Sequence, residues 1–442
     1  MEHIRPGLAA FAVVWLGQTV SLLGSAMTWF ALTIWAFQVT GQATTLAMLG
    51  FFSFGPTLLF SPLAGALVDR WNRKRVMMIS DLTAGLATLA VLGLYMTNRL
   101  QVWHLYGVGF LAGWFQAFQY PAYAAAVALM VPREQYARAS GMLEVAYAAP
   151  GVLAPLLAGV LLGSIGISGI MAVDVVTFVL ALGTLAAVRV PQPQVSQEGW
   201  QGRGTLWQES LYGFRYIRRS GLWGLQGLFC VGNLVEYTGF ALFTPMLLAR
   251  TENNELILGS VQSAGAVGGL VGGLALSIWG GSRRKIHGVL LGWTLSSLGM
   301  LAMGLGRNLP LWLAASFLFT FFEPIVNGSV QAIWQIKVPP DVQGRVFATQ
   351  FFISQGTYPL AMLWAGPLAD HGFEPALRPG GWLAPALGPL FGVGPGCGMA
   401  VLIALAGLLG MVIPLMGYAV RAVRDVESLL PDYDTRVPDG LG

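Results

Sequence analysis

The chain is a succession of long apolar runs separated by short polar stretches. A helix needs about 20 residues to cross about 30 Å of hydrocarbon, and runs of that length recur from one end of the sequence to the other. We place them at residues 9–38, 44–68, 76–97, 103–130, 139–163, 167–188, 222–249, 256–279, 287–306, 310–336, 346–369 and 397–420. This pattern predicts an all-α integral membrane protein with twelve transmembrane helices.

The second half of the chain repeats the first. Val131–Glu134 leads to Arg138 between two apolar runs, and 207 residues later Val338–Asp341 leads in the same way to Arg345. A repeat of this size predicts two six-helix bundles related by pseudo-two-fold symmetry. The predicted parts are an N-terminal bundle (1–188), a cytoplasmic linker (189–221), a C-terminal bundle (222–421) and a cytoplasmic tail (422–442).

Composition and charge agree with a membrane location. Hydrophobic residues make up 55% of the chain and charged residues 10%, too few charges to cover a soluble surface of this size. The sequence pI of about 9.1 does not indicate a nucleic-acid partner, because the basic residues form short clusters between apolar runs. With both termini in the cytoplasm, all but four of the 24 Lys and Arg residues lie inside, the exceptions being Arg99, Arg250, Arg307 and Arg378. We therefore expect a multi-pass protein of the inner (plasma) membrane.

Catalytic and metal-binding patterns are missing from the sequence. The two cysteines and four histidines are scattered and show no ligand spacing, so we expect neither a metal nor a cofactor. There is no phosphate-binding Gly-x-x-x-x-Gly-Lys-Ser/Thr loop, no Gly-x-Ser-x-Gly elbow and no plausible triad. We therefore expect a protein that is not an enzyme and is not driven by ATP within this chain.

The polar loop between the second and third apolar runs carries the most specific motif. It contains Gly65, Asp69, Arg70, Arg73 and Lys74 in that order. This loop resembles the signature Gly-x-Leu-x-Asp-Arg-x-x-Arg-Lys of the major facilitator superfamily, with all the key positions filled. An aspartate at this place can face the positive N-terminal end of another helix.

The resemblance implies a role for this loop as a cytoplasmic gate. It implies that Asp69, with Arg70 and Arg73, closes the cytoplasmic side against the eleventh span, which starts near Arg345. We include Gly65, Lys74 and Arg138 in the same candidate gate. The alternative interpretation is that the arginines only set the topology.

Several other stretches narrow the resemblance to one branch. Residues 53–82, 129–138, 174–178, 392–396 and 426–432 are similar to macrolide exporters and enterobactin-type siderophore exporters, so that nearly the whole chain is covered. This resemblance implies proton-driven efflux. Two departures argue against direct transfer of that mechanism: Ser25 stands where many members carry an acid, and the fifth-span antiporter motif is only partly present at Pro155–Gly159.

Acidic residues within the apolar runs are the main candidates for chemistry. A charged group in hydrocarbon costs about 2.5–3.5 kcal/mol on insertion scales, so each needs a partner or a purpose. Glu323 and Glu236 are the leading candidates for proton coupling or cation binding, with a neutral, hydrogen-bonded structural role as the alternative. Asp174 is expected to tie its helix to a neighbour, and Glu144, close to the cytoplasmic end, to reach water or Arg138.

Neutral polar residues add to the possible lining of a substrate cavity. Within the repeat, Ser21 aligns with Glu236 and Gln116 with Glu323. Pairs at helical spacing lie on one face, as Gln116 and Gln119 do. The candidate lining residues are Gln18, Gln116, Gln119, Asn233, Asn327 and Gln331. With aromatic neighbours, such faces suit a large, partly apolar molecule.

These features predict a secondary transporter of a small-molecule substrate, with protons as the coupling ion, embedded in the lipid bilayer as a monomer. Our first hypothesis is an exporter of a bulky amphipathic or siderophore-like compound that works by alternating access. The same fold permits an uptake symporter or facilitator, a lipid translocase, or a receptor without transport. For the Pro- and Gly-rich segment 371–396 we expect an extracellular loop, with packing over the outer mouth as the alternative.

Overall fold

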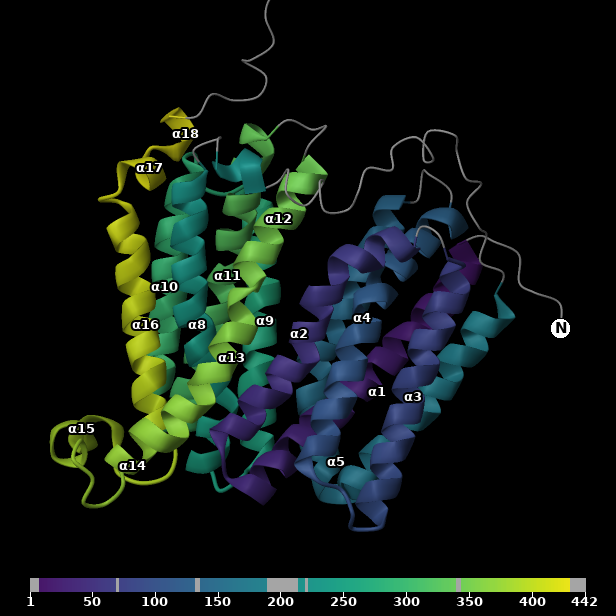
Figure 1. Cartoon of the computed structure of the whole chain (residues 1–442), viewed down its shortest axis with the longest axis horizontal. Coiled ribbons are helices and arrows are strands. Elements are labelled where there is room, and N and C mark those ends of the chain that lie inside the picture. The colour runs from purple at the N-terminus through teal and green to yellow at the C-terminus, as the bar shows by residue number, and fades with distance from the viewer. Residues whose placement is uncertain are drawn as a thin grey trace, which may run out of the picture. The chain divides into compact units, whose positions relative to one another are not determined.

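The computed structural model describes residues 8–68, 71–131, 136–188, 214–218, 222–338 and 343–429, and nearly all of them are helical (Figure 1). The long helices are α1 (Leu8–Thr40), α2 (Ala43–Val68), α3 (Arg73–Met96), α4 (Val102–Met130), α5 (Tyr136–Ala187), α8 (Trp223–Arg250), α9 (Glu255–Trp279), α10 (Lys285–Leu305), α11 (Leu309–Lys337), α12 (Gln343–Gln355), α13 (Thr357–Leu368) and α16 (Cys397–Gly417). Among the described residues, nine helices are long and apolar enough to cross a membrane. The prediction of an all-α membrane protein is confirmed.

Each of the twelve predicted ranges is helical in the structure. Two of them, 139–163 and 167–188, follow one another in α5, where Gly166 interrupts the helix with a φ of 66°. Glycine adopts this backbone conformation readily because it has no Cβ. The range 346–369 is divided between α12 and α13, which meet at Gly356.

The chain forms two compact units. Unit 1 comprises residues 1–197 and 247–263, and unit 2 comprises residues 198–246 and 264–442. Of the predicted linker 189–221, only residues 214–218 belong to the described part of the chain. The predicted bundle boundaries stay a prediction, and each unit is described by itself below.

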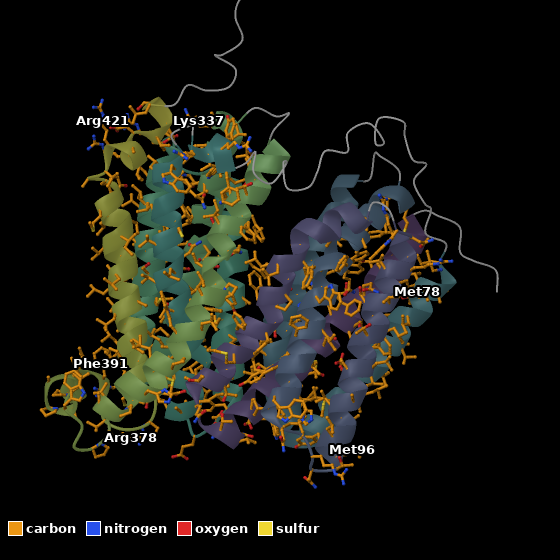
Figure 2. All side chains as sticks on the ribbon, in the orientation of Figure 1. Met78, Met96, Lys337, Arg378, Phe391 and Arg421 are labelled. Atoms are coloured by element: carbon orange, nitrogen blue, oxygen red, sulfur yellow. The ribbon has the colours of Figure 1, made fainter. Side chains whose placement is uncertain are left out.

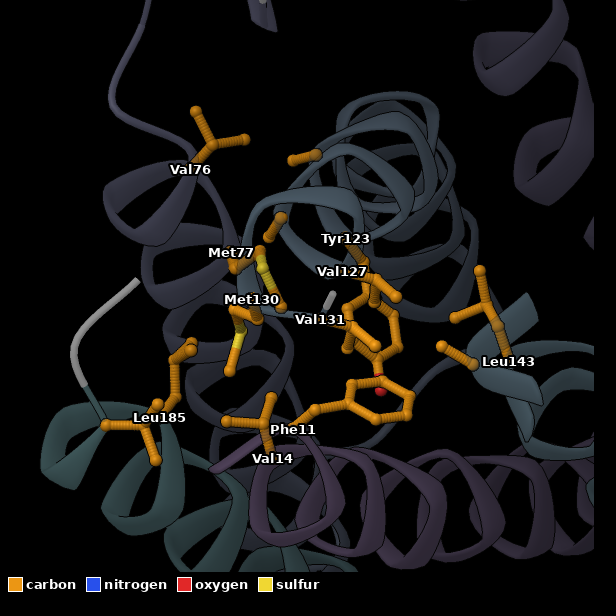
Figure 3. Packing of buried hydrophobic residues seen from close by; sticks show 14 of the residues in the cluster. Phe11, Val14, Val76, Met77, Tyr123, Val127, Met130, Val131, Leu143 and Leu185 are labelled. Carbon is orange, nitrogen blue, oxygen red and sulfur yellow. The ribbon is translucent and has the colours of Figure 1, made fainter. Parts of the chain in front are cut away.

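The core of unit 1 joins α1, α3, α4 and α5. Figure 3 shows Phe11 and Val14 of α1 packed with Met77, Tyr123 and other buried side chains of this cluster. Close approach of α1 to α5 depends on two glycines of α1, as a Cβ on Gly17 or Gly24 would collide with the side chain of Thr184 or Thr177. Residues seven positions apart lie on one helix face. The two glycines therefore leave that face of α1 without side chains at two successive contacts with α5.

Unit 2 uses the same spacing in α8. A Cβ on Gly232 would collide with the ring of Trp293 in α10, and one on Gly239 would crowd Met300 and Ala406. The core around these contacts includes Phe229, Trp334 and Val423. Glycines seven residues apart therefore allow close helix packing in both units, against the second part of α5 in unit 1 and against α10 and α16 in unit 2.

Short helices follow the long ones at the two ends of unit 2. At one end, the π-helical turn Ala369–Phe373 leads to α14 (Glu374–Ala376) and α15 (Ala384–Phe391), so the predicted loop 371–396 contains helical structure. At the other end lie α17 (Arg421–Arg424) and α18 (Val426–Leu429). Figure 2 shows Arg378 and Phe391 at the first end and Lys337 and Arg421 at the second.

Two glutamates of unit 2 cap helix N-termini, which carry unsatisfied backbone N–H groups. Glu374 accepts hydrogen bonds from the backbone nitrogens of Gly396 (3.1 Å) and Met399 (2.9 Å), at the start of α16. Glu427 accepts from the backbone nitrogens of Lys285 (3.0 Å) and Ile286 (3.1 Å), at the start of α10. The segments outside the long helices are thereby fixed to the ends of unit 2.

Candidate functional site

A cavity of about 280 Å³ lies inside unit 1, between α1, α3, α4 and the second part of α5. The structure brings together in its wall four residues predicted from the sequence: Gln18, Gln116, Gln119 and Asp174. Ser21 of α1 lines it as well. Polar positions of three separate apolar runs thus converge on one space.

Asp81 of α3 is the central polar residue of this cavity, and our sequence interpretation overlooked it. Its side chain is buried and accepts one hydrogen bond on each oxygen, from Gln18 Nε2 and from Gln119 Nε2, both at 2.7 Å. Gln119 Nε2 also lies 3.3 Å from Gln18 Oε1. The signal was present in the sequence, because Asp81 is an acidic residue within the apolar run 76–97.

Asp174 of α5 forms a second carboxylate cluster in the same wall. Ser25 Oγ donates to one carboxylate oxygen at 3.0 Å, and Thr88 Oγ1 donates to the other at 3.1 Å. These bonds join α5 to α1 and α3, as expected for a residue that ties its helix to neighbours. Ser25 occupies the position where many members of the resembling branch carry an acid, and here it serves as a donor.

Glu236 and Glu323 interact within unit 2. Glu236 is on α8 and Glu323 on α11, and their carboxyl groups are close enough to interact electrostatically. Trp293 of α10 donates its indole N–H to Glu236 Oε2 at 2.7 Å. For Glu323, no hydrogen-bond donor is seen among residues 222–338 and 343–429, and its described polar neighbours include the carboxyl group of Glu236 and the hydroxyl of Tyr237.

Further polar and aromatic groups surround this pair. Tyr237 interacts electrostatically with both glutamates, donates to Gln355 Oε1 at 2.5 Å and packs edge-on against Tyr358 at 5.0 Å between ring centres. Asn233 Nδ2 donates weakly to the backbone oxygen of Ser354, at 3.4 Å. Sequence reasoning missed Trp293 and Tyr237, because an aromatic residue in an apolar run is more often a packing residue than a polar partner.

The other predicted lining residues of α11 are not part of this cluster as described. Asn327 and Gln331 are both exposed. They lie one turn apart, on one face of the helix, as the spacing predicted. Their role in substrate contact stays a prediction.

Most of the predicted cytoplasmic gate lies outside the described residues. This holds for Asp69 and Arg70, and for the side chains of Arg138 and Arg345; the side chain of Glu144 is likewise not described. Lys74 is described, and its Nζ donates to the backbone oxygens of Ala186 (3.0 Å) and Val188 (2.7 Å) at the C-terminal end of α5. A cation is stabilised there by the helix dipole. Gly65 lies in the last turn of α2, three residues before Val68, and Arg73 is the first residue of α3.

The described part of the chain shows no cluster of the side chains that most often bind metals. No group of three or more His, Cys, Asp or Glu side chains in those residues is arranged to hold a metal ion. The chemistry that the two sites offer is therefore that of carboxyl groups with amide, hydroxyl and indole donors: hydrogen bonding, proton uptake and the binding of positive charge.

Comparison with known proteins assigns the class. The Major Facilitator Superfamily profile matches residues 14–361, and the chain belongs to this family. It is accordingly a multi-pass membrane transporter of small molecules. The resemblance stated from the signature loop is confirmed.

Two relatives and one solved structure illustrate the match. Macrolide efflux protein A of Streptococcus pyogenes is 28% identical over 394 residues, which cover 84% of this chain and 92% of that protein. The enterobactin exporter EntS of Salmonella typhi is 24% identical over 347 residues, covering 76% and 80% respectively. A bacterial homologue of the iron transporter ferroportin has the same fold, with a TM-score of 0.66, 15% identity and coverage of 92% and 98%.

Proposed function

We propose that this protein is a proton-coupled exporter of a bulky amphipathic compound, macrolide-like or siderophore-like, in the inner membrane of a bacterium. The direction and the substrate class are supported by the relatives, which are named as macrolide and enterobactin exporters. The proposal includes alternating access and both termini in the cytoplasm. It also includes a cytoplasmic gate in which Asp69, with Arg70 and Arg73, closes against the eleventh span near Arg345. We further propose that the protein functions as a monomer.

The observation that carries the coupling proposal is the pair formed by Glu236 and Glu323. Two carboxylates at close range inside a membrane protein repel one another, and the pair is favoured when one of them carries a proton. Because only one fixed donor, the Trp293 indole, is seen at this pair among the described residues of unit 2, little else offsets a second negative charge. A proton bound here can leave when water reaches the site from the other side of the membrane.

The test measures transport driven by a pH gradient. Purified protein is reconstituted in liposomes, and movement of radiolabelled erythromycin, as a macrolide probe, is followed together with proton flux from an internal pH-sensitive dye. Glu323→Gln and Glu236→Gln keep the size of each side chain and remove its titration. We expect each to lower gradient-driven transport at least about tenfold, which corresponds to about 1.4 kcal/mol.

The control is Glu252→Gln, which removes one carboxyl from an exposed turn after α8 and should leave transport unchanged. Normal gradient-driven transport by both the Glu236 and the Glu323 variant would contradict the proposal that these residues couple transport to protons. Uptake toward the cytoplasmic side, driven by an inward proton gradient, would instead favour a symporter of the same fold.

A further inference from the structure

The cavity in unit 1 holds two carboxylates that the coupling proposal does not use. Asp81 and Asp174 both line it, and each has a hydrogen-bond donor on both of its oxygens. All four donors are neutral amides or hydroxyls. The residues that line the cavity, all in the described part of unit 1, include no Lys, Arg or His. The wall therefore positions two acidic groups precisely enough to bind positive charge and supplies none itself.

Ser80 gives an independent sign that a polar ligand fits here. Its side chain is 1% exposed, it lines the cavity beside Asp81, and its Oγ has no hydrogen-bond partner. Leaving a buried hydroxyl unsatisfied is unfavourable. A ligand that bonds to Asp81 can satisfy this hydroxyl at the same time, because both residues line the same cavity.

The shape and chemistry of the cavity distinguish an organic cation from a metal ion. Calcium takes six to eight oxygen ligands, and no cluster of three acidic or other metal-binding side chains occurs among the described residues. The remaining wall carries apolar and aromatic groups, including Trp29 and Phe115. Such rings favour a ligand with an apolar body and can attract a cation through their faces.

We propose that this cavity binds a primary ammonium group attached to a small apolar body. The ammonium donates to the carboxylate of Asp81 and to Ser80 Oγ, while its body lies against Trp29 and Phe115. Asp174 acts from a distance: its partner Thr88 is seven residues beyond Asp81 on α3, or about 10 Å along the helix. The proposal concerns unit 1 alone and stands whether or not Glu236 and Glu323 couple transport to protons.

The test measures binding of benzylammonium to the full-length protein in lipid nanodiscs by isothermal titration calorimetry at pH 7.5. Benzyl alcohol and benzoate, which have the same ring but no positive charge, are the matched ligands. We expect benzylammonium to bind at least about tenfold more tightly than either, because a hydrogen bond between charged groups is stronger than one between neutral groups.

Three variants locate the site. Asp81→Asn keeps the shape and the amide contacts but removes the charge, and should weaken benzylammonium binding about ten- to hundredfold. Ser80→Ala should weaken it less, and Asp174→Asn by about three- to tenfold through loss of the longer-range attraction. Asp425→Asn removes a partly exposed carboxylate beside Arg424, outside the long helices, and should leave binding unchanged.

Several results would overturn the proposal. Equal affinity for benzylammonium and benzyl alcohol would show that charge is not recognised, and unchanged binding by Asp81→Asn and Ser80→Ala would place the ligand elsewhere. Calcium or sodium binding that depends on Asp81 and excludes benzylammonium would make this an inorganic cation site. If Asp81→Asn does not fold, Ser80→Ala and Asp174→Asn decide the matter, because neither loses an amide contact of Asp81.

Discussion

Corresponding helices of the two units make the same kind of polar contact with the roles exchanged. In unit 1, Gln18 of α1 donates to Asp81 of α3 at 2.7 Å. In unit 2, Glu236 of α8 accepts from Trp293 of α10, also at 2.7 Å. The acid therefore lies on the third helix of one unit and on the first helix of the other. A repeated backbone has retained the contact between two helices while the donor and the acceptor changed places.

The difference extends to the positions that align in the repeat. Ser21 and Gln116 line the cavity of unit 1, and their counterparts in unit 2 are Glu236 and Glu323, which interact with one another. Unit 1 thus surrounds each carboxylate with neutral donors, whereas unit 2 brings two carboxyl groups together. Fixed donors suit the binding of positive charge, and a carboxyl pair suits the exchange of a proton.

The sharpest test of this comparison is a pair of double variants in the transport assay. If Glu236 and Glu323 act as one proton site, as we propose, Glu236→Gln with Glu323→Gln should lower transport no further than about twofold beyond the worse single variant. Asp81→Asn with Glu323→Gln combines one substitution from each unit and should show the product of the single effects, because the cation site and the proton site are proposed to act independently.

A fully additive result for the two glutamates would separate them into independent sites. Strong coupling between Asp81 and Glu323, with no further loss in the double variant, would instead make the two units parts of one proton pathway. Both outcomes can be read from initial rates measured on the same liposome preparation.

The fold could be predicted closely because the apolar runs are long and carry few charges. All twelve ranges are helical, with bounds that differ by a few residues, and even the separation of 139–163 from 167–188 reflects the interruption at Gly166. The packing could not be predicted in the same way. A transmembrane helix that is apolar around its whole circumference carries little periodicity to show which face turns inward.

The site shows the same limit. Gln116, Gln119 and Asp174 could be named as unusual polar residues, but their meeting with Asp81 depends on how α1, α3, α4 and α5 pack. The sequence did not indicate that Trp293 belongs to the site, because its indole acts as a polar partner only where it lies beside Glu236. Acidic residues within apolar runs were a stronger signal, because they singled out Glu236 and Glu323 as candidates before their interaction was visible.

A second test compares the two units by the effect of a tightly packed glycine on the stability of the protein. A Cβ on Gly113 of α4 would collide with the backbone oxygen of Ser53, and one on Gly272 of α9 with the backbone oxygen of Phe321. Because neither backbone can move aside cheaply, we expect each Gly→Ala change to destabilise the protein by about 1–3 kcal/mol. Thermal unfolding in nanodiscs measures the effect.

Matched controls lie on the same two helices. A Cβ on Gly107 of α4 meets nothing within 4 Å, and one on Gly269 of α9 makes only an ordinary contact at 3.9 Å. Alanine at either place should be neutral or stabilising, by up to about 1 kcal/mol, because it has the higher helix propensity. A loss at Gly113 without one at Gly272 would show that the two units do not share this packing.

The smallest expected effect is on stability and concerns Glu374, the glutamate that caps the N-terminus of α16. Burial raises the pKa of the Glu374 carboxyl above its usual range, while the backbone N–H groups of Met399 and Gly396 act in the opposite direction. With a raised pKa, the folded protein binds this proton more tightly than the unfolded chain does. The contribution of Glu374 to stability is then fully present below the unfolded pKa, about 4.3, and declines as pH rises through the folded pKa.

Glu374→Gln removes this titration, so the gap in unfolding temperature between the unmodified protein and the variant should narrow as pH rises from 4 to 8. We expect the change to be about 1 kcal/mol, close to the effect of one helix cap. Glu427→Gln is the matched variant, since it alters a glutamate that caps α10 in the same way at the other end of unit 2. If the difference in unfolding temperature between the unmodified protein and Glu374→Gln widens as pH rises, the N–H donors of α16 outweigh burial and hold the carboxylate ionised.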